Sequence, residues 1–236
     1  MNIEMAVSSV IGFVPAILLL YILLRRYEGL FNEKFIFFSF GGGMVVGMII
    51  TVLHMFTEYT LLIFVVLFPL FEELAKLVIL NWPKLKLKHE TVYYGAALGL
   101  GIGSMAIIAI AFKVFIDFPE SLGNPQTYLD LVILSFNFCL LNSATGVIIG
   151  FACSKGEVSG FFFRAFIVHA VYNLFFFIYM LSGEVLKYAP LAVATIFAFG
   201  LFWYVLHGLL PEAVPPEMQQ KRRREKRRKV REERKK

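Results

Sequence analysis

The feature that most constrains this chain is a succession of apolar segments, each about as long as a membrane-spanning helix. A helix needs about 20 predominantly apolar residues to cross the hydrocarbon core of a bilayer. With 58% hydrophobic residues and a mean hydropathy of +0.72, the chain has more apolar surface than a water-soluble domain can bury. Seven spans are predicted, at about 5–24, 35–53, 60–80, 93–115, 129–152, 161–181 and 190–209. We therefore expect an all-α fold, a polytopic membrane bundle of about seven transmembrane helices that forms one domain over residues 1–210.

The charges of the connecting segments predict how these helices are oriented. Short loops on the cytoplasmic side of a membrane carry an excess of Lys and Arg. Three connections have this character, at 25–34, 81–91 and 154–164. The alternate connections are poor in Lys and Arg and carry acidic residues, namely Glu58, Asp117, Glu120 and Glu184. The alternation predicts a multi-pass protein of the cell membrane with its N-terminus outside and its C-terminus in the cytoplasm.

The basic character of the chain is confined to its C-terminal end. Residues 217–236 hold 12 of the 23 Lys and Arg and 4 of the 17 Asp and Glu, which leaves 11 basic and 13 acidic residues elsewhere. We expect residues 211–236 to form a disordered, basic cytoplasmic tail. A basic run beside a membrane is attracted to anionic lipid headgroups by about 1 kcal/mol per Lys or Arg. Nucleic acid is not an expected partner, because no aromatic side chains are interleaved to stack on bases.

The predicted span at 60–80 contains two carboxylates and an ammonium, Glu72, Glu73 and Lys76. Each ionisable side chain at the centre of a membrane helix is unfavourable by about 2.5–3.5 kcal/mol, and such residues mark functional sites that face an interior. Lys76 lies four residues from Glu72 and three from Glu73, so it can approach either carboxylate. Adjacent side chains point about 100° apart, so one carboxylate can do chemistry while the other holds a neighbouring helix. The alternative is a buried ion pair that only locks helix packing.

Two other spans carry small or polar residues at helical spacing. Gly95, Gly99 and Gly103 recur every four residues and predict a smooth stripe for tight helix contact. Asn142 lies in the middle of its span, where an unsatisfied amide is expensive and an interhelical hydrogen bond is the simplest explanation.

His169 and Asn173 are four residues apart, so they share one face of their predicted helix. Together with Glu72 and Glu73 they supply a general acid or base, a hydrogen-bond donor and an amide in a place where water is scarce.

Three motifs in the middle of the chain resemble one membrane protease family. They are Glu72-Glu73-x-x-Lys76, Tyr94-Gly95-Ala96-Ala97-x-Gly99-x-Gly101 and His169-x-x-x-Asn173. In order and spacing they are similar to the PrsW-type glutamic intramembrane proteases, which are distant relatives of the CAAX prenyl-protease membrane family. The resemblance covers roughly residues 60–180.

The resemblance implies an intramembrane endopeptidase that cleaves membrane-anchored protein substrates without a metal or other cofactor. Glu72 would activate a water, Glu73 would orient the site or hold a neighbouring helix, and His169 and Asn173 would stabilise the oxyanion. Where the family commonly has a histidine, this chain has Asn142, four residues after Phe138. An asparagine can hold a water or an oxyanion but cannot transfer a proton.

Other classes of function fit the same residues. A catalytically inactive relative would act as a membrane scaffold or helix-binding protein, with Glu72 and Lys76 as a packing pair, and Asn142 favours this interpretation. A small ion-coupled transporter would use Glu72 and Glu73 as proton or cation sites, but no inverted repeat is evident. A zinc enzyme would use the glutamates and His169 as ligands, but the chain lacks the HExxH spacing.

Overall fold

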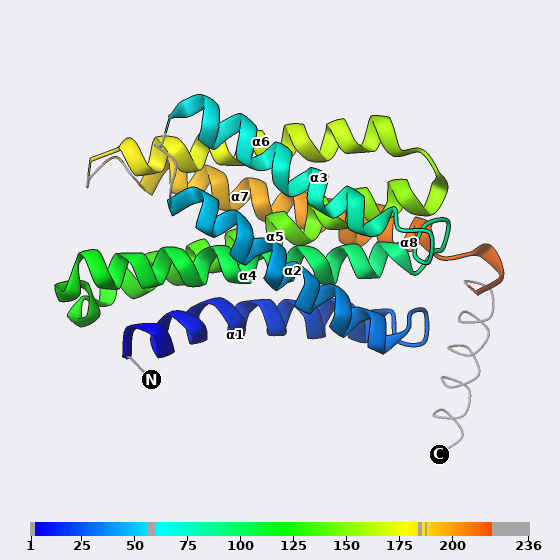
Figure 1. Ribbon diagram of the computed structural model, residues 1–236, viewed down its shortest axis with the longest axis horizontal. Helices are drawn as coiled ribbons and strands as arrows, with labels where there is room; N and C mark the ends of the chain where they lie inside the picture. The colour runs from blue at the N-terminus through cyan, green and yellow to red at the C-terminus, as the bar shows by residue number, and fades with distance from the viewer. Residues whose placement is uncertain (1–2, 56–59, 184–185, 187, 219–236) are drawn as a thin grey trace, which may run out of the picture.

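The computed structural model describes residues 3–55, 60–183, 186 and 188–218, and these residues contain helices and turns but no strand. Figure 1 shows an elongated bundle in which most helices follow the long axis, while α2 and α3 cross it obliquely. The longer helices are α1 (Ile3–Arg26), α2 (Glu33–Met55), α3 (Phe68–Leu80), α4 (Thr91–Asp117), α5 (Pro125–Lys155), α6 (Val158–Leu181) and α7 (Tyr188–Tyr204). Two π turns, Ile63–Leu67 and Val205–Leu209, lead into α3 and into the short helix α8 (Leu210–Ala213).

Six helices in the described part of the chain are long and apolar enough to cross a membrane. They are α1, α2, α4, α5, α6 and the continuous helix from Tyr188 through Ala213. The prediction of an all-α bundle of membrane-spanning length is therefore confirmed, and six of the seven expected spans correspond to these helices. The remaining expected span, 60–80, is also helical over most of its length, as the π turn and α3, and its three ionisable residues lie within α3 and not at its ends.

The centre of the bundle is the antiparallel pair α4 and α5, and α5 is buried over most of its length. The backbones of this pair approach closely through glycine. A Cβ added at Gly99 would lie 1.9 Å from the carbonyl oxygen of Asn142, and one added at Gly95 would lie 2.1 Å from that of Gly146. Gly103 faces the carbonyl of Phe138 at 2.6 Å in the same way. The three glycines of the Gly-x-x-x-Gly pattern thus set the distance between the two central helices.

The opposite side of α4 packs closely against α2, again through glycine residues. A Cβ at Gly101 would lie 2.1 Å from the carbonyl oxygen of Phe40, and one at Gly43 would lie 2.0 Å from that of Leu98. Helix α4 therefore has a close neighbour on two faces, which makes it the fixed element against which the other helices are placed.

A proline follows each π turn as the second residue after it. This proline leaves one carbonyl of the turn without a backbone donor. In the first turn the N–H of Phe68 donates to the carbonyl of Ile63, five residues back. The next donor in that register belongs to residue 69, which is Pro69 and has no N–H. The carbonyl of Phe64 is therefore left for a partner from outside its own helix.

The second π turn repeats this pattern at the end of α7. The N–H of Leu210 donates to the carbonyl of Val205, and the next residue is Pro211. The carbonyl left over is that of Leu206, and it accepts a hydrogen bond from the hydroxyl of Tyr27 at 3.3 Å. A side chain from α1's C-terminal end thus completes the backbone bonding of this turn.

The predicted boundary between bundle and tail, at residues 210 and 211, falls inside α8. Residues 210–214 pack on the bundle, with Leu210, Ala213 and Val214 buried. The basic run at 221–229 lies outside the described residues.

Candidate functional site

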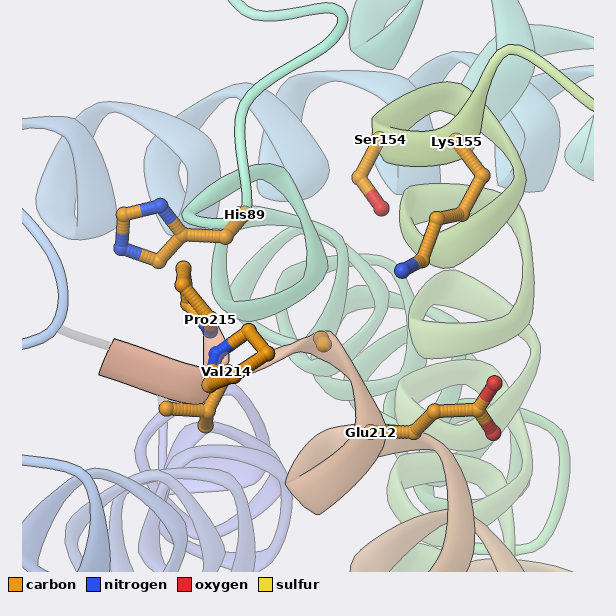
Figure 2. A pocket seen from close by; sticks show the side chains of 8 residues that line it. His89, Ser154, Lys155, Glu212, Val214 and Pro215 are labelled. Carbon is orange, nitrogen blue, oxygen red and sulfur yellow. The ribbon is translucent and has the colours of Figure 1, made fainter. Parts of the chain in front are cut away.

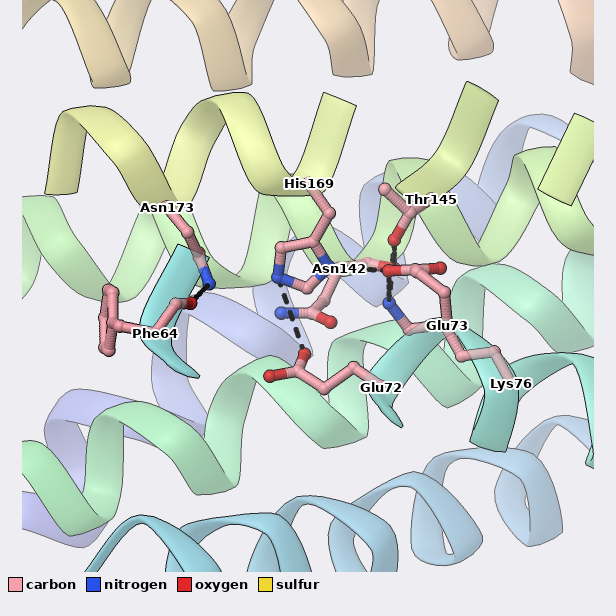
Figure 3. Close-up of polar contacts among 8 residues, drawn as sticks. All are labelled: Phe64, Glu72, Glu73, Lys76, Asn142, Thr145, His169 and Asn173. Atoms are coloured by element: carbon pink, nitrogen blue, oxygen red, sulfur yellow. Dashed lines mark hydrogen bonds and ion pairs between the residues drawn. The ribbon is translucent and has the colours of Figure 1, made fainter. Parts of the chain in front are cut away.

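Three helices bring the predicted polar residues to one place inside the bundle (Figure 3). Helix α3 contributes Glu72, Glu73 and Lys76. Helix α5 contributes Asn142 and Thr145, and α6 contributes His169 and Asn173. Glu72 is 7% exposed, and the other six are between 0% and 4% exposed. The structure therefore assembles residues separated by up to about 100 positions in sequence into one buried cluster.

Glu73 is at the centre of this cluster. Its Oε1 accepts a hydrogen bond from the Nζ of Lys76 at 2.6 Å and lies 2.6 Å from the Nδ1 of His169. The Nζ of Lys76 also donates to the Oγ1 of Thr145 at 2.7 Å. Of the two carboxylates that Lys76 could approach, it pairs with Glu73. The resulting network joins α3, α5 and α6 through charge-assisted hydrogen bonds, which are the strong ones.

Glu72 approaches the same imidazole from its other side. Its Oε2 lies 3.7 Å from the Nε2 of His169, which is too far for a hydrogen bond but close for two ionisable groups. Side chains 100° apart on α3 thus reach the two opposite nitrogens of one ring. Two carboxylates, an ammonium and an imidazole thus lie next to one another in the interior of the bundle.

Contact with Glu73 orients His169. A carboxylate oxygen is an acceptor, so the hydrogen in this contact belongs to Nδ1. A carboxylate that binds one imidazole nitrogen fixes the ring and its tautomer and leaves the other nitrogen for chemistry. Nε2, which faces Glu72, is the nitrogen that remains available.

Asn142 brings an amide without a partner to this cluster. Neither its Nδ2 nor its Oδ1 has a hydrogen-bond partner among the described residues, although the side chain is 1% exposed. In Figure 3 its carboxamide points toward Glu72 and His169. A buried amide without hydrogen bonds is unfavourable by about 1–3 kcal/mol. Such a group is explained when it binds a substrate or water.

Asn173 has a different environment from the one expected of it. Its Nδ2 donates to the carbonyl oxygen of Phe64 at 3.1 Å, the carbonyl that Pro69 leaves without a backbone donor. This contact ties α6 to the π turn that precedes Glu72. The amide predicted to stabilise an oxyanion is thus engaged in holding the helix that carries the carboxylates, and only its Oδ1 is without a partner among the described residues.

Two parts of the site were missing from the sequence interpretation. Thr145 lies three residues after Asn142 on the same face of α5, and this spacing was a signal that could have connected it to the cluster. Its Oγ1 also donates to the carbonyl of Asn142 at 3.3 Å, so it links the lysine to the backbone beside the free amide. The Phe64 carbonyl could have been found from Pro69, three residues before Glu72.

The stripe of Gly95, Gly99 and Gly103 lies behind the cluster, between α4 and α5. Gly99 touches the backbone of Asn142, so it determines how deeply that residue sits in the bundle. The glycines themselves contribute no side chain to the polar cluster.

Chemically, the cluster combines a carboxylate with a free oxygen, an oriented imidazole and an unpaired amide in a setting with little water. These are the groups needed for proton transfer and for stabilising a developing negative charge. Within the described ranges, no group of three or more His, Cys, Asp or Glu is arranged to hold a metal ion. Comparisons with protein-family models, curated proteins and solved structures found no match to this chain.

Proposed function

We propose that this protein is an intramembrane endopeptidase that cleaves membrane-anchored protein substrates. One observation carries the proposal. The imidazole of His169 is held at Nδ1 by Glu73 and faces Glu72 with Nε2, in the interior of a bundle with membrane-spanning helices. This arrangement places a base, Glu72, beside an acid, His169, where both can reach one substrate peptide bond.

In the proposed reaction Glu72 accepts a proton from a water, and the resulting hydroxide attacks the carbonyl carbon of a substrate peptide bond. The oxygen of that carbonyl becomes negative, and the amide of Asn142 and the Nε2–H of His169, which carries a proton on both nitrogens at this step, stabilise it by hydrogen bonds. The C–N bond then breaks as Nε2 gives its proton to the leaving nitrogen, and the proton held by Glu72 passes to Nε2 to restore the site. The 3.7 Å between Glu72 Oε2 and His169 Nε2 is too short for a water on the line between them, so a water that contacts both atoms lies to one side of the pair.

The assignment differs from the resemblance in one respect. Asn142, whose carboxamide is free, takes the oxyanion role together with His169. Asn173, whose amide is bound to Phe64, positions α3 against α6. Glu73 and Lys76 are the pair that holds the histidine in place.

The proposal includes a membrane topology of seven spans with the N-terminus outside and the C-terminus in the cytoplasm of a cell membrane. The seventh span is the helix formed by the π turn Ile63–Leu67 and α3, whose charged side chains are buried against α5 and α6. Figure 1 supports this topology, because the turns within the basic segments 25–34, 81–91 and 154–164 gather at the end of the bundle where α8 lies. The excess of Lys and Arg near those connections is that of a cytoplasmic side.

The decisive experiment compares the wild-type protein with Glu72→Gln in cells. New protein N-termini that fall within membrane-spanning segments are enriched and identified by mass spectrometry, so no substrate has to be known beforehand. We expect a set of such termini that is present with the wild type and absent with Glu72→Gln, while both proteins accumulate in the membrane to the same level. Identical sets of termini in the two samples would refute the protease assignment.

A second function, that of a non-catalytic helix-binding scaffold, is favoured by the Glu73–Lys76–Thr145 network and by the amide at position 142. The network connects three helices as a packing device would, and an amide cannot move a proton. The variant Asn142→His separates the two functions. New cleavage by this variant, when the wild type shows none, would identify the natural protein as the scaffold.

A further inference from the structure

A separate cavity of about 410 Å³ lies at the end of the bundle, where the loop before α4, the last turn of α5 and α8 meet (Figure 2). Its wall contains His89, Ser154, Lys155 and Glu212, and residues 213–216 complete it with apolar side chains. Small-molecule sites in proteins measure about 300–1,000 Å³ and combine apolar walls with a few placed polar groups. None of these residues belongs to the site around Glu73 and His169.

The backbone of the loop is strained beside this cavity. Leu87 has a φ of 61°, a left-handed conformation that is uncommon for a large side chain. Its N–H donates to the carbonyl of Cys153 at 3.0 Å, and its side chain contacts the position of Gly156 at the end of α5. The strained residue thus clamps the loop onto α5 and places His89 across the cavity from Lys155. Strain of this kind is characteristic of binding sites, where the surroundings hold it in place.

The polar groups of the cavity carry both signs of charge and are not paired with each other. Figure 2 shows the ammonium of Lys155 directed into the hollow, with the carboxylate of Glu212 on the same side and the imidazole of His89 across from them. Within the described part of the chain, neither Lys155 nor Glu212 forms a salt bridge. A ligand that complements this cavity therefore carries an anion and a cation within one small group.

The surroundings of the cavity are those of a membrane surface. Trp82 and Leu87 are exposed in the same loop, together with Lys84, Lys86 and Lys88. Exposed tryptophan is typical of the level of the lipid headgroups, and lysines beside it are attracted to phosphate. Lipid headgroups are thus the charged ligands that we expect at this end of the bundle.

We propose that this cavity binds a zwitterionic aminoalkyl phosphate, the chemistry of a phosphatidylethanolamine headgroup. The phosphate lies against Lys155 and His89, and the ammonium donates hydrogen bonds to Glu212. Choline headgroups have the same charges but no N–H to donate, so the cavity discriminates between the two. Phosphatidylglycerol can meet Lys155 but leaves Glu212 without a partner.

The test uses the full-length protein in detergent, equilibrated with equal amounts of phosphatidylethanolamine, phosphatidylcholine and phosphatidylglycerol and analysed by native mass spectrometry. We expect the wild type to retain the ethanolamine lipid about tenfold better than the choline lipid, as the loss of a charge-assisted hydrogen bond predicts. Glu212→Gln should reduce this ratio toward one, and Lys155→Gln should weaken retention of all three lipids about tenfold.

Controls distinguish the cavity from general attraction of lipids to charge. Lys88→Gln removes an exposed lysine of the same loop that does not line the cavity, and it should leave the ethanolamine-to-choline ratio unchanged. Competition with soluble O-phosphoethanolamine identifies the source: displacement of the lipid shows one shared site, and binding of the soluble compound alone shows a free ligand of the same chemistry. An ethanolamine-to-choline ratio that Glu212→Gln does not change, or absence of binding by both lipid and soluble compound, would overturn the proposal.

Discussion

Two regions of the molecule share one local design, the π turn that ends at a proline. In each, the second residue of the turn has a carbonyl that the proline leaves without a donor. Asn173 from α6 binds the carbonyl of Phe64 at 3.1 Å, and Tyr27 binds that of Leu206 at 3.3 Å. The amide contact is buried near the charged cluster, whereas the phenol contact is close to the exposed His207 at the end of the bundle.

The difference between the two turns lies in the helix to which each one leads. The first turn leads into α3, which carries Glu72, Glu73 and Lys76, and its outside donor comes from the same helix face as His169. The second turn leads into the short helix α8, whose Glu212 lines the cavity at the end of the bundle, but its outside donor, Tyr27, does not line that cavity. A proline-ended π turn is thus not a functional signature by itself. It becomes one when the donor that completes it lies on a helix that also carries a reacting group.

The largest expected difference in stability between variants of the two regions comes from removing a buried charge. Lys76→Met leaves Glu73 buried without its ammonium partner, and breaking a buried pair in this way destabilises proteins by about 3–5 kcal/mol. His207→Leu, within the second turn, changes an exposed side chain and should shift stability by less than about 0.5 kcal/mol. Equilibrium unfolding in mixed micelles measures both. Equal effects of the two substitutions would show that the cluster after the first turn has no special electrostatic role.

The next comparison removes the outside donor of each turn. Asn173→Leu leaves the Phe64 carbonyl unsatisfied in a buried place, and we expect a loss of about 2–3 kcal/mol. Tyr27→Phe affects a longer bond at the bundle's end, and we expect about 0.5–1 kcal/mol. Thermal unfolding in detergent shows which of the two substitutions lowers the stability more. An equal or larger loss of stability in Tyr27→Phe would show that the bond at the first turn is no more important than the bond at the second.

The substitution with the smallest expected effect tests whether Pro69 is the reason that the Phe64 carbonyl lacks a backbone donor. Pro69→Ala restores an N–H that can reach the Phe64 carbonyl, so in the Asn173→Leu background it should recover about 1 kcal/mol. A double-mutant cycle isolates this coupling. Additive effects of the two substitutions would mean that the proline and the asparagine act independently.

Most of the fold could be predicted from the sequence because helix length and hydrophobicity determine it directly. In the described part of the chain, the apolar segments correspond to the helices, and the polar connections correspond to the turns between them. The π turns were not predicted, since the sequence Ile63–Leu67 is as apolar in a π register as in an α register. Their presence depends on the backbone position of a proline and on a donor more than 100 residues away.

The sequence predicted which residues come together in the cluster better than it predicted which of them contact each other. Spacing alone allowed Lys76 to approach Glu72 or Glu73, and the position of α6, with His169, relative to α3 resolves this in favour of Glu73. The cavity at the end of the bundle had no sequence signal, because His89, Lys155 and Glu212 come from three distant segments and have no common motif.

The buried charges of α3 also have a consequence for the biosynthesis of the protein. Thr145 follows Lys76 by 69 residues and His169 follows Glu73 by 96, so the ribosome makes the charged helix long before its partners. In a bilayer without them, each of its three ionisable side chains is unfavourable by about 2.5–3.5 kcal/mol. In the proposed seven-span topology, we therefore expect the helix from residue 61 to 80 to take its final place only after α6 has been synthesised, as a late step in assembly.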